Sequence, residues 1–318
     1  MGNNRASAMS PFRPLAAPRK TLVLANPKSG PGFSVDALWR AIDDHFGGPG
    51  REVLREVSRD VDDGRRKTEQ ALRDGVDTVL VAGGDGMVNS IGAILAGTPA
   101  ALGVIPAGSG NGFARHFGIP LALPAAVAAL ACADRRAIDV GLANGRPFFV
   151  TCGMAWDAAI ARGFAAFPFR GILPYVFAAD AELVAYVPQP VAVSLDGGPW
   201  QTFAEPVIFT VANLTQYGGG ARIAPRAQAD DGLMEMVVVL RSDLPVVLMN
   251  LGRLFNGTLD RLPQVRTHRC RTLDVRRETA APIQLDGELV PAGREVEIRL
   301  RPRALEVLVP RAAGAGFT

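Results

Sequence analysis

The sequence predicts an α/β fold, with a parallel-sheet N-terminal domain followed by a β-rich domain of antiparallel sheet or sandwich. Apolar runs alternate with amphipathic segments as far as about residue 137, and short apolar runs separated by turn residues follow. Three glycine-bearing loops follow three of the first apolar runs. We therefore divide the 318 residues into a disordered basic tail (1–19), an α/β domain (20–137), a β-rich domain (138–300) and a C-terminal segment (301–318) that can pack back on the first domain.

Strand and helix signals alternate through the first domain. Residues 21–26, "TLVLAN", form a short apolar run that is typical of a buried strand, and the Pro and Gly of "PKSGPG" end it. Ser34 can cap the next helix, because apolar residues then recur on one face. The later strand signals are "REVLREV", "TVLVA" and "ALGVIP", and the later helix signals are "DDGRRKTEQALRDG" and "MVNSIGAILAG". Repeated units of this length imply a parallel sheet with right-handed crossovers.

The second domain is expected to consist mainly of short strands. Turn residues separate these strands, which suits an antiparallel sheet, and one helix is expected over about residues 172–187. The strand signals are "AIDVGLA", "RPFFVTCGM", "PVAVSLDG", "EPVIFTVANL", "LMEMVVVL", "TLDVRRE", "PIQLDGE" and "EVEIRL". A final run, "ALEVLVP", is a strand that can pair with the first domain.

Composition excludes several classes of protein. No segment approaches the roughly 18 uninterrupted apolar residues of a spanning helix, and the N-terminus lacks the apolar core of a signal peptide. Three cysteines and three histidines are scattered along the chain, so neither a disulfide framework nor a structural metal cluster is expected. The net charge of +3 is mild. We expect a cytoplasmic protein with no nucleic-acid partner.

The three glycine-bearing loops predict a binding site for nucleotide phosphates. Residues 26–30, 83–89 and 108–111 each follow a strand signal, and the carboxyl ends of parallel strands meet at one edge of a sheet. Glycine lets the backbone approach a phosphate closely, and the N-terminus of a following helix favours negative charge. Neither G-x-G-x-x-G nor G-x-x-x-x-G-K-[ST] occurs in the chain. The first domain is therefore predicted to be Rossmann-like and nucleotide-binding, but without these two common motifs.

Five motifs together resemble the diacylglycerol kinase catalytic family, which includes bacterial soluble lipid kinases, sphingosine kinases and ceramide kinase. They are "NPKSG", "GGDGMVN", "IPAGSGNGFAR", "VANLTQYGGGARIAPRAQADDGLMEMVV" and "QLDGE", in the order of the family. The resemblance covers about residues 20–310. It implies an ATP-dependent lipid kinase that transfers the γ-phosphate of ATP to a lipid hydroxyl, with a diacylglycerol-like acceptor favoured and the reaction in a cleft between the domains.

The resemblance assigns the three loops to Mg-ATP. Asp85 is the carboxylate among the glycines and is expected to help position Mg-ATP, and Ser58 falls where relatives place a hydroxyl near the nucleotide. The expected nucleotide-binding residues of the loops are Asn26, Pro27, Lys28, Ser29 and Gly30, then Gly83, Gly84, Asp85, Gly86, Met87, Val88 and Asn89, and finally Gly108, Ser109, Gly110 and Asn111.

The motif "LDGE" carries the other expected catalytic carboxylates. By resemblance, Glu288 is the general base that accepts the proton of the lipid hydroxyl, and Asp286 is its neighbour, which acts towards the metal. Asp-Gly is also a strong hairpin signal, so Asp286 and Gly287 can form a turn between two strands. The two interpretations are compatible.

The loop "RAQADDGLM" is the expected position of a second, structural Mg²⁺. The resemblance places the carboxylate of Asp231 and the carbonyl oxygens of Gln228 and Leu233 around this ion. Hard cations prefer such oxygen ligands. A simple Asp-Gly turn without a cation is the alternative.

Three positions depart from the pattern of the family. Met87, Ser90 and Gly112 stand where relatives commonly have Thr, Glu and Asp, and Met87 removes a hydrogen-bonding side chain near the nucleotide. The sequence does not predict whether these three changes reduce the turnover rate. The alternatives to a lipid kinase are an enzyme similar to NAD kinase, which shares "GGDG", a small-alcohol kinase, and a catalytically weak protein that senses a nucleotide or a lipid.

The expected partner is a lipid substrate at the inner membrane surface, which the protein visits through a transient peripheral contact. The basic stretch 266–277, "RTHRCRTLDVRR", can meet anionic headgroups or can be an ordinary polar strand face. The identity of the lipid, the role of the basic tail and the oligomeric state, with a homodimer among the options, stay open.

Overall fold

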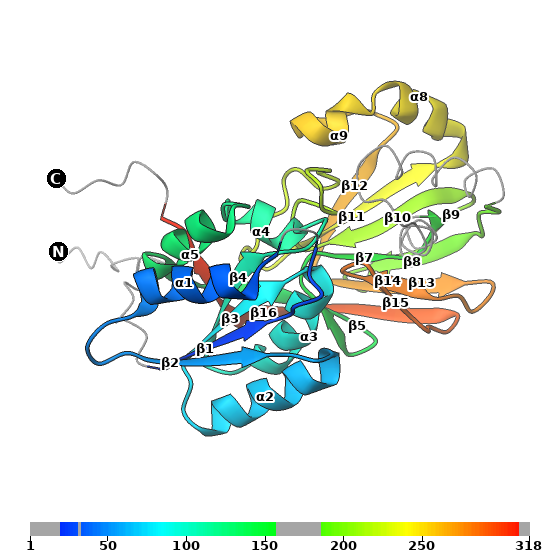
Figure 1. Cartoon of the computed structure of the whole chain (residues 1–318). Coiled ribbons are helices and arrows are strands. Elements are labelled where there is room, and N and C mark those ends of the chain that lie inside the picture. The colour runs from blue at the N-terminus through cyan, green and yellow to red at the C-terminus, as the bar shows by residue number, and fades with distance from the viewer. Residues whose placement is uncertain (1–19, 31–32, 157–185, 312–318) are drawn as a thin grey trace, which may run out of the picture.

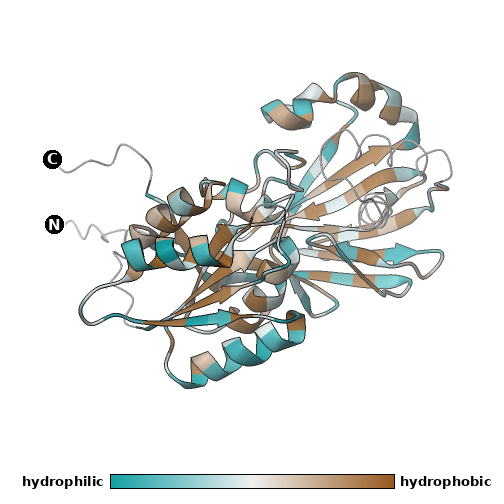
Figure 2. Cartoon of the chain, viewed as in Figure 1, coloured by the Kyte–Doolittle hydropathy of each residue, from teal (hydrophilic) through white to brown (hydrophobic). Residues whose placement is uncertain are grey.

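The computed structural model describes residues 20–30, 33–156 and 186–311. The N-terminal part contains four parallel strands in the order β2 (Glu52–Val57), β1 (Lys20–Ala25), β3 (Thr78–Gly83) and β4 (Ala101–Pro106). The strands β1, β3 and β4, which come after β2 in this order, are almost entirely buried and apolar, as expected for central strands covered on both faces (Figure 2). Their carboxyl ends therefore lie together at one edge of the sheet, where the three glycine-bearing loops begin.

Helices cover both faces of this parallel sheet (Figure 1). Helices α1 (Val35–Phe46) and α5 (Leu123–Ala131) pack on one face, and α2 (Val61–Arg73) and α3 (Asp85–Leu95) pack on the other. The predicted cap of the first helix is present, since the side-chain oxygen of Ser34 accepts a hydrogen bond from the N–H of Ala37. A short helix, α4 (Gly112–His116), follows the third loop.

The last strand returns to the first sheet, as the sequence indicated. β16 (Glu295–Val309) pairs in parallel with β4 near its C-terminal end and antiparallel with β5 (Asp134–Ala143) along most of its length. Its first five residues pair with β13 (Thr272–Arg277), so this one long strand joins the parallel and antiparallel parts of a ten-stranded sheet. The other members are β6 (Arg146–Phe148), β8 (Val191–Leu195), β9 (Gln201–Phe203) and β13 (Thr272–Arg277).

A second, six-stranded sheet packs on the antiparallel part of the first. Its strands run in the order β12 (Arg266–Cys270), β11 (Met234–Leu240), β10 (Pro206–Ala212), β7 (Thr151–Gly153), β14 (Ile283–Leu285) and β15 (Glu288–Val290). Buried side chains of both sheets form one core, to which Phe209 and Met236 contribute from the second sheet and Val275 and Ile298 from the first. The C-terminal part is therefore a β-sandwich.

The chain after β11 contains short helical elements that the sequence analysis did not predict. Residues there form a 3₁₀ turn, η1 (Arg241–Asp243), and the short helices α8 (Leu244–Met249) and α9 (Gly252–Asn256), followed by a second 3₁₀ turn, η2 (Leu259–Arg261). Pro245 occupies the first turn of α8, a position that favours a helix start. Of the helix expected over residues 172–187, all but the last two residues lie outside the described residues. In the described ranges, no helix is long and apolar enough to cross a membrane.

Candidate functional site

The three predicted loops meet at the carboxyl edge of the parallel strands. The N–H of Asn26 donates to the carbonyl of Ala82 at 3.0 Å, and the N–H of Ala107 donates to the carbonyl of Gly83 at 3.1 Å. The second and third loops touch through their backbones, since a Cβ on Gly108 would lie 2.6 Å from the Cα of Gly84. Glycine is therefore required for this approach, and the loops form one surface.

Two asparagines hold the first and third loops in shape. The side-chain oxygen of Asn26 accepts from the N–H of Lys28 at 3.0 Å. Asn111 exchanges two hydrogen bonds with the backbone of Gly108 and has a left-handed φ of 50°. By contrast, the hydroxyl of Ser29 is buried and has no hydrogen-bond partner within the described residues. This orphaned hydroxyl at the loop surface is compatible with a bound polar ligand.

Helix α3 places Asp85 at the centre of the loops. The helix begins after Gly84 without a side-chain cap, so its first turn presents backbone N–H groups together with this carboxylate. Gly110 lies against the carboxylate, because a Cβ there would be 2.9 Å from Asp85 Oδ2. Burial raises the pKa of Asp85 to about 6; the N–H groups of Gly112, Phe113 and Asn111 oppose the rise and the charge of Asp286 adds to it.

Glu288 comes to the same loops from the β-sandwich. The two-residue turn Asp286–Gly287 joins β14 to β15 with φ values of 50° and 91°, so the hairpin interpretation is confirmed. Residue 288 follows directly, and its carboxylate lies against the first turn of α3, since a Cβ on Gly86 would be 2.5 Å from Glu288 Oε1. Partial burial raises the pKa of Glu288, and the negative charge of Asp286 raises it further.

Asp286 is buried, and both of its carboxylate oxygens are fully occupied. Oδ1 accepts from the N–H groups of Val150 and Thr151 at 2.8 and 2.9 Å, and Oδ2 accepts from the N–H of Phe149 at 2.8 Å. Oδ2 also accepts from Asn89 Nδ2 on α3 at 2.7 Å. Four protein donors therefore fill the positions that a metal ion would use. The carboxylate instead connects the hairpin that carries Glu288 to the helix that carries Asp85.

Ser58 and the predicted second Mg²⁺ loop lie on different parts of the protein. Ser58 is buried at the end of β2, where its N–H and hydroxyl both donate to the carbonyl of Ala25 at the end of β1. Asp231 accepts from the N–H of Leu233 at 3.0 Å through Oδ1 and pairs with Arg269 through Oδ2. Gln228 is exposed. No group of three His, Cys, Asp or Glu side chains could hold a metal in the described part of the chain.

The three departures from the family pattern have different surroundings. The side chain of Met87 folds back over Gly83, where a Cβ would lie 2.7 Å from its sulfur, and packs against the core of the first domain. Ser90 is buried on α3, with its hydroxyl unpaired among the described residues. At Gly112, a Cβ would lie 3.3 Å from the backbone of Gln216 and Gly218. The space for a larger side chain at this position is therefore taken by another loop.

Two contributions to the site were missed in the sequence. The N–H groups of Phe149, Val150 and Thr151 hold Asp286, and backbone donors leave no side-chain pattern that could reveal them. The loop after β10 also contacts the third glycine-bearing loop, since the N–H of Gly219 donates to the carbonyl of Gly110 at 2.8 Å. The three consecutive glycines at 218–220, all with positive φ, were the available signal for this close approach.

Comparisons with known proteins match both parts of the chain. Residues 20–143 match the diacylglycerol kinase catalytic domain, and residues 150–309 match the YegS C-terminal NAD kinase beta sandwich-like domain. The chain is 33% identical over 303 residues to "Diacylglycerol kinase" of Mycobacterium tuberculosis, covering 92% of this chain and 96% of that protein. It is 32% identical over 275 residues to "Probable lipid kinase YegS-like" of Pseudomonas aeruginosa, covering 82% and 86%.

A solved structure shares the fold. The crystal structure of a diacylglycerol kinase from Bacillus anthracis superposes with a TM-score of 0.73 at 20% sequence identity, covering 93% of this chain and 98% of that chain. At that identity the likeness concerns the fold, and the sequence matches over both domains establish the family. The chain therefore belongs to the family of lipid kinases that joins a diacylglycerol kinase catalytic domain to a YegS-type C-terminal domain.

Proposed function

We propose that this protein transfers the terminal phosphoryl group of ATP to the hydroxyl of a diacylglycerol-like lipid. The observation that carries the proposal is the contact between Glu288 and the first turn of α3. It brings a carboxylate from the β-sandwich to the glycine loops of the parallel sheet, so that a proton acceptor and a phosphate-binding surface face each other. Phosphoryl transfer requires this combination of positioning and charge stabilisation.

The loops fit the phosphates of a nucleotide. Backbone N–H groups in the first turn of α3, close glycine packing and the unpaired hydroxyl of Ser29 offer donors without bulky side chains. Bound there, ATP supplies the phosphoryl group and Mg²⁺ neutralises part of its charge. Asp85 would hold the ion, because Mg²⁺ is commonly bound through one or two carboxylates together with phosphate oxygens and water.

Glu288 would accept the proton of the lipid hydroxyl. A carboxylate with a pKa above its ordinary value is a better proton acceptor, and both partial burial and the nearby charge of Asp286 act in this direction. Asp286 would act as a positioning residue and not as a metal ligand, because protein donors occupy both of its oxygens. We propose no role for a cation at Asp231 in the reaction, since Arg269 and the N–H of Leu233 already occupy its oxygens.

The proposal is tested with labelled ATP, Mg²⁺ and a panel of lipids in mixed micelles. We expect transfer of label to a diacylglycerol-like lipid, and loss of transfer in both Glu288→Ala and Asp85→Ala. A water-soluble alcohol in the same assay distinguishes a small-alcohol kinase. If no lipid is labelled, or if either variant labels lipid as fast as the wild type, the proposed reaction is wrong. Binding of ATP without transfer would instead identify a nucleotide sensor.

Access to the lipid requires a transient contact with the cytoplasmic face of the membrane. Sedimentation with vesicles of diacylglycerol in neutral or anionic phospholipid measures this contact. We expect binding to be stronger on the anionic vesicles and to weaken as salt rises, because cationic side chains near a charged surface each add a favourable electrostatic contribution.

A further inference from the structure

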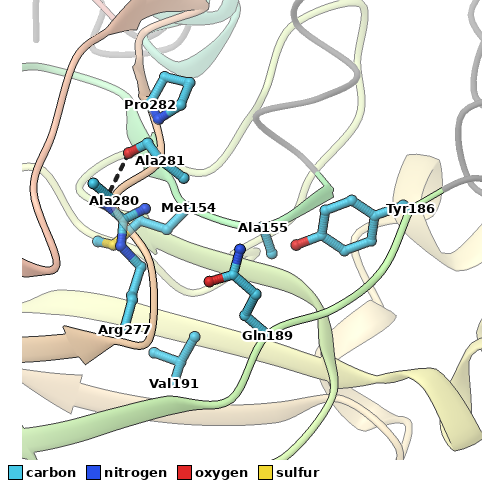
Figure 3. Close-up of a pocket in the computed structure, with 9 residues that line it drawn as sticks. All are labelled: Met154, Ala155, Tyr186, Gln189, Val191, Arg277, Ala280, Ala281 and Pro282. Carbon is cyan, nitrogen blue, oxygen red and sulfur yellow. Dashed lines mark hydrogen bonds between the residues drawn. The ribbon is translucent and has the colours of Figure 1, made fainter.

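A buried arginine, Arg277, lines a cavity in the β-sandwich (Figure 3). The cavity, of about 220 Å³, lies between the end of β7, the start of β8, the end of β13 and the start of β14. Met154, Val191 and Pro282 give it apolar walls, and Arg277 and Gln189 contribute polar groups. Its volume is several times the roughly 30 Å³ that a water molecule occupies in the liquid. The cavity can therefore hold a group larger than a single water.

The guanidinium of Arg277 is held in place by two of its five N–H donors, and the other three are unused. Only 7% of the residue is exposed. Its Nη2 donates to the carbonyls of Ala281 and Gly293 at 2.8 and 2.6 Å, whereas Nε and Nη1 are buried and have no hydrogen-bond partner within the described residues. A buried cation with unused donors is unfavourable unless something complements it.

No carboxylate complements this cation in the described part of the chain. The adjacent Arg276 points the other way, where it pairs with Glu295 and lies over the ring of Trp200. Arg277 has no ion pair among the described residues, and burial lowers its pKa from the ordinary value. The two adjacent arginines therefore have different surroundings. Arg276 pairs with an acid at the surface, whereas Arg277 is buried beside a cavity.

A second donor group is fixed at the same cavity. Gln189 Oε1 accepts from the N–H and the hydroxyl of Thr279 at 3.2 and 2.6 Å, which sets the orientation of the amide. Its amide nitrogen then points towards Ala155, which also lines the cavity (Figure 3). The unused N–H groups of an arginine form a planar fork that suits carboxylate and phosphate oxygens.

The cavity is separate from the contact between Glu288 and α3. Pro282 lines the cavity just before β14, whereas Asp286 lies in the hairpin just after this strand, so the two residues are four positions apart along the chain. At about 3.3 Å for each residue of a strand, this separation is roughly 13 Å. A group at Arg277 is therefore not the hydroxyl that lies at Glu288.

We propose that this cavity binds the carboxylate or phosphate group of an anionic amphiphile, with Arg277 as the charged ligand and the neighbouring apolar walls receiving the adjoining hydrocarbon. The two sources of this chemistry are a fatty-acid carboxylate and a phospholipid phosphate. The site goes beyond the proposed kinase reaction, because it needs neither ATP nor Glu288.

The test measures binding to the full-length protein by calorimetry in the absence of ATP. The probes are decanoate, 1-decanol, dioctanoyl phosphatidate below its micellar concentration, and inorganic phosphate. We expect decanoate or phosphatidate to bind saturably and at least tenfold more tightly than decanol, because only the anions complement the guanidinium. The anion that binds more tightly identifies the source. Equal binding of decanol and both anions, no binding of either anion, or binding of inorganic phosphate as tight as that of the amphiphiles would overturn the proposal.

Variants locate the site. Arg277→Met should weaken anion binding at least tenfold, and Arg276→Met is the matched control, since it removes the same charge from the adjacent exposed position and should leave binding unchanged. Glu288→Ala should also bind as the wild type does, so failure of the kinase reaction and failure of this site are distinguishable. If Arg277→Met does not fold, the comparison of decanoate with decanol on the wild type still decides the proposal. Unchanged binding in a folded Arg277→Met contradicts it.

Discussion

Two Asp-Gly turns of the β-sandwich have the same sequence signal and different surroundings. Asp286 is buried, and its carboxylate accepts four hydrogen bonds from N–H donors of residues 149–151, at the start of β7, and of α3. Asp231 is only partly buried, and its carboxylate pairs with Arg269 and one N–H close in sequence. The comparison teaches that an Asp-Gly pair specifies a turn, whereas the partners that the fold brings to the carboxylate decide whether that turn carries part of a catalytic site.

The largest effect on turnover is expected for substitution of Glu288, the residue that follows the Asp286–Gly287 turn. Glu288→Gln keeps the size of the side chain but removes the proton acceptor, so we expect turnover to fall by about 10²–10⁴-fold with little change in stability. Steady-state transfer of label from ATP, with a thermal melt for stability, checks this. Glu278→Gln is the matched control, because Glu278 is exposed on the segment that precedes β14 and should tolerate the change. Equal losses in the two variants would contradict the assignment.

The two turns themselves should respond unequally to Asp→Asn. Asp286→Asn places an amide among four N–H donors, so we expect a loss of about 1–3 kcal/mol in the free energy of unfolding, together with a clear loss of turnover. Asp231→Asn removes a partly exposed ion pair, for which about 0–1 kcal/mol and unchanged turnover are expected. Denaturant melts and transfer assays of both variants measure the difference. Similar results for both would remove the distinction between the turns.

The pH profile separates a positioning role of Asp286 from a purely structural one. The charge of Asp286 raises the pKa of Glu288, so its removal should lower that pKa. Since Glu288 must be ionised to accept a proton, the acid limb of the kcat profile should move to lower pH in Asp286→Asn. The apparent affinity for Mg²⁺ should change little, because neither oxygen of Asp286 is available to a metal. A large rise in the Mg²⁺ requirement with an unshifted acid limb would support the direct metal role instead.

Substitution of Asp85 should change stability less than substitution of Asp286, and in the opposite direction. Burial raises its pKa to about 6 in the folded protein, so the folded state disfavours the ionised carboxylate relative to the unfolded chain. This cost is absent below the ordinary pKa near 3.8, grows as pH rises towards 6, and is constant above it. Asp85→Asn should therefore stabilise the protein by on the order of 1 kcal/mol at pH 7–8 and not at pH 4. Melts at both pH values, with transfer assays that show lost turnover, test this.

The close approach of the glycine-bearing loops could be predicted from the sequence because glycine acts locally. A glycine motif after an apolar strand reports a close backbone approach wherever the rest of the chain goes, and the contact between Gly84 and Gly108 is of this kind. The role of Asp286 could not be predicted in the same way, because three of its four partners are backbone groups and all four lie more than 130 residues away. The direct metal role suggested for it took no account of those donors.

The burial of Arg277 could be predicted from the sequence, but its unpaired donors could not. Alternation along "TLDVRR" puts Leu273, Val275 and Arg277 on one face of β13, and the first two are fully buried. The pattern therefore indicated a buried arginine, although the sequence interpretation treated the whole basic stretch as one surface. What alternation could not show is that Nε and Nη1 lack a partner, since that depends on which side chains β7, β8 and β14 bring to the cavity.

The smallest effect on catalysis is expected for substitution of Met87, the departure nearest to Asp85 along the chain. Its side chain packs over Gly83 and against the core, so Met87→Thr exchanges apolar packing for a hydroxyl beside the phosphate loops. We expect stability to fall by about 1 kcal/mol through the lost packing, while the KM for ATP falls a few-fold if the hydroxyl reaches the nucleotide. Met87→Leu is the control, because it keeps the packing and adds no hydrogen bond. Identical KM values in the two variants would mean that residue 87 serves the core of the first domain alone, and that the KM for ATP does not depend on a hydroxyl at this position.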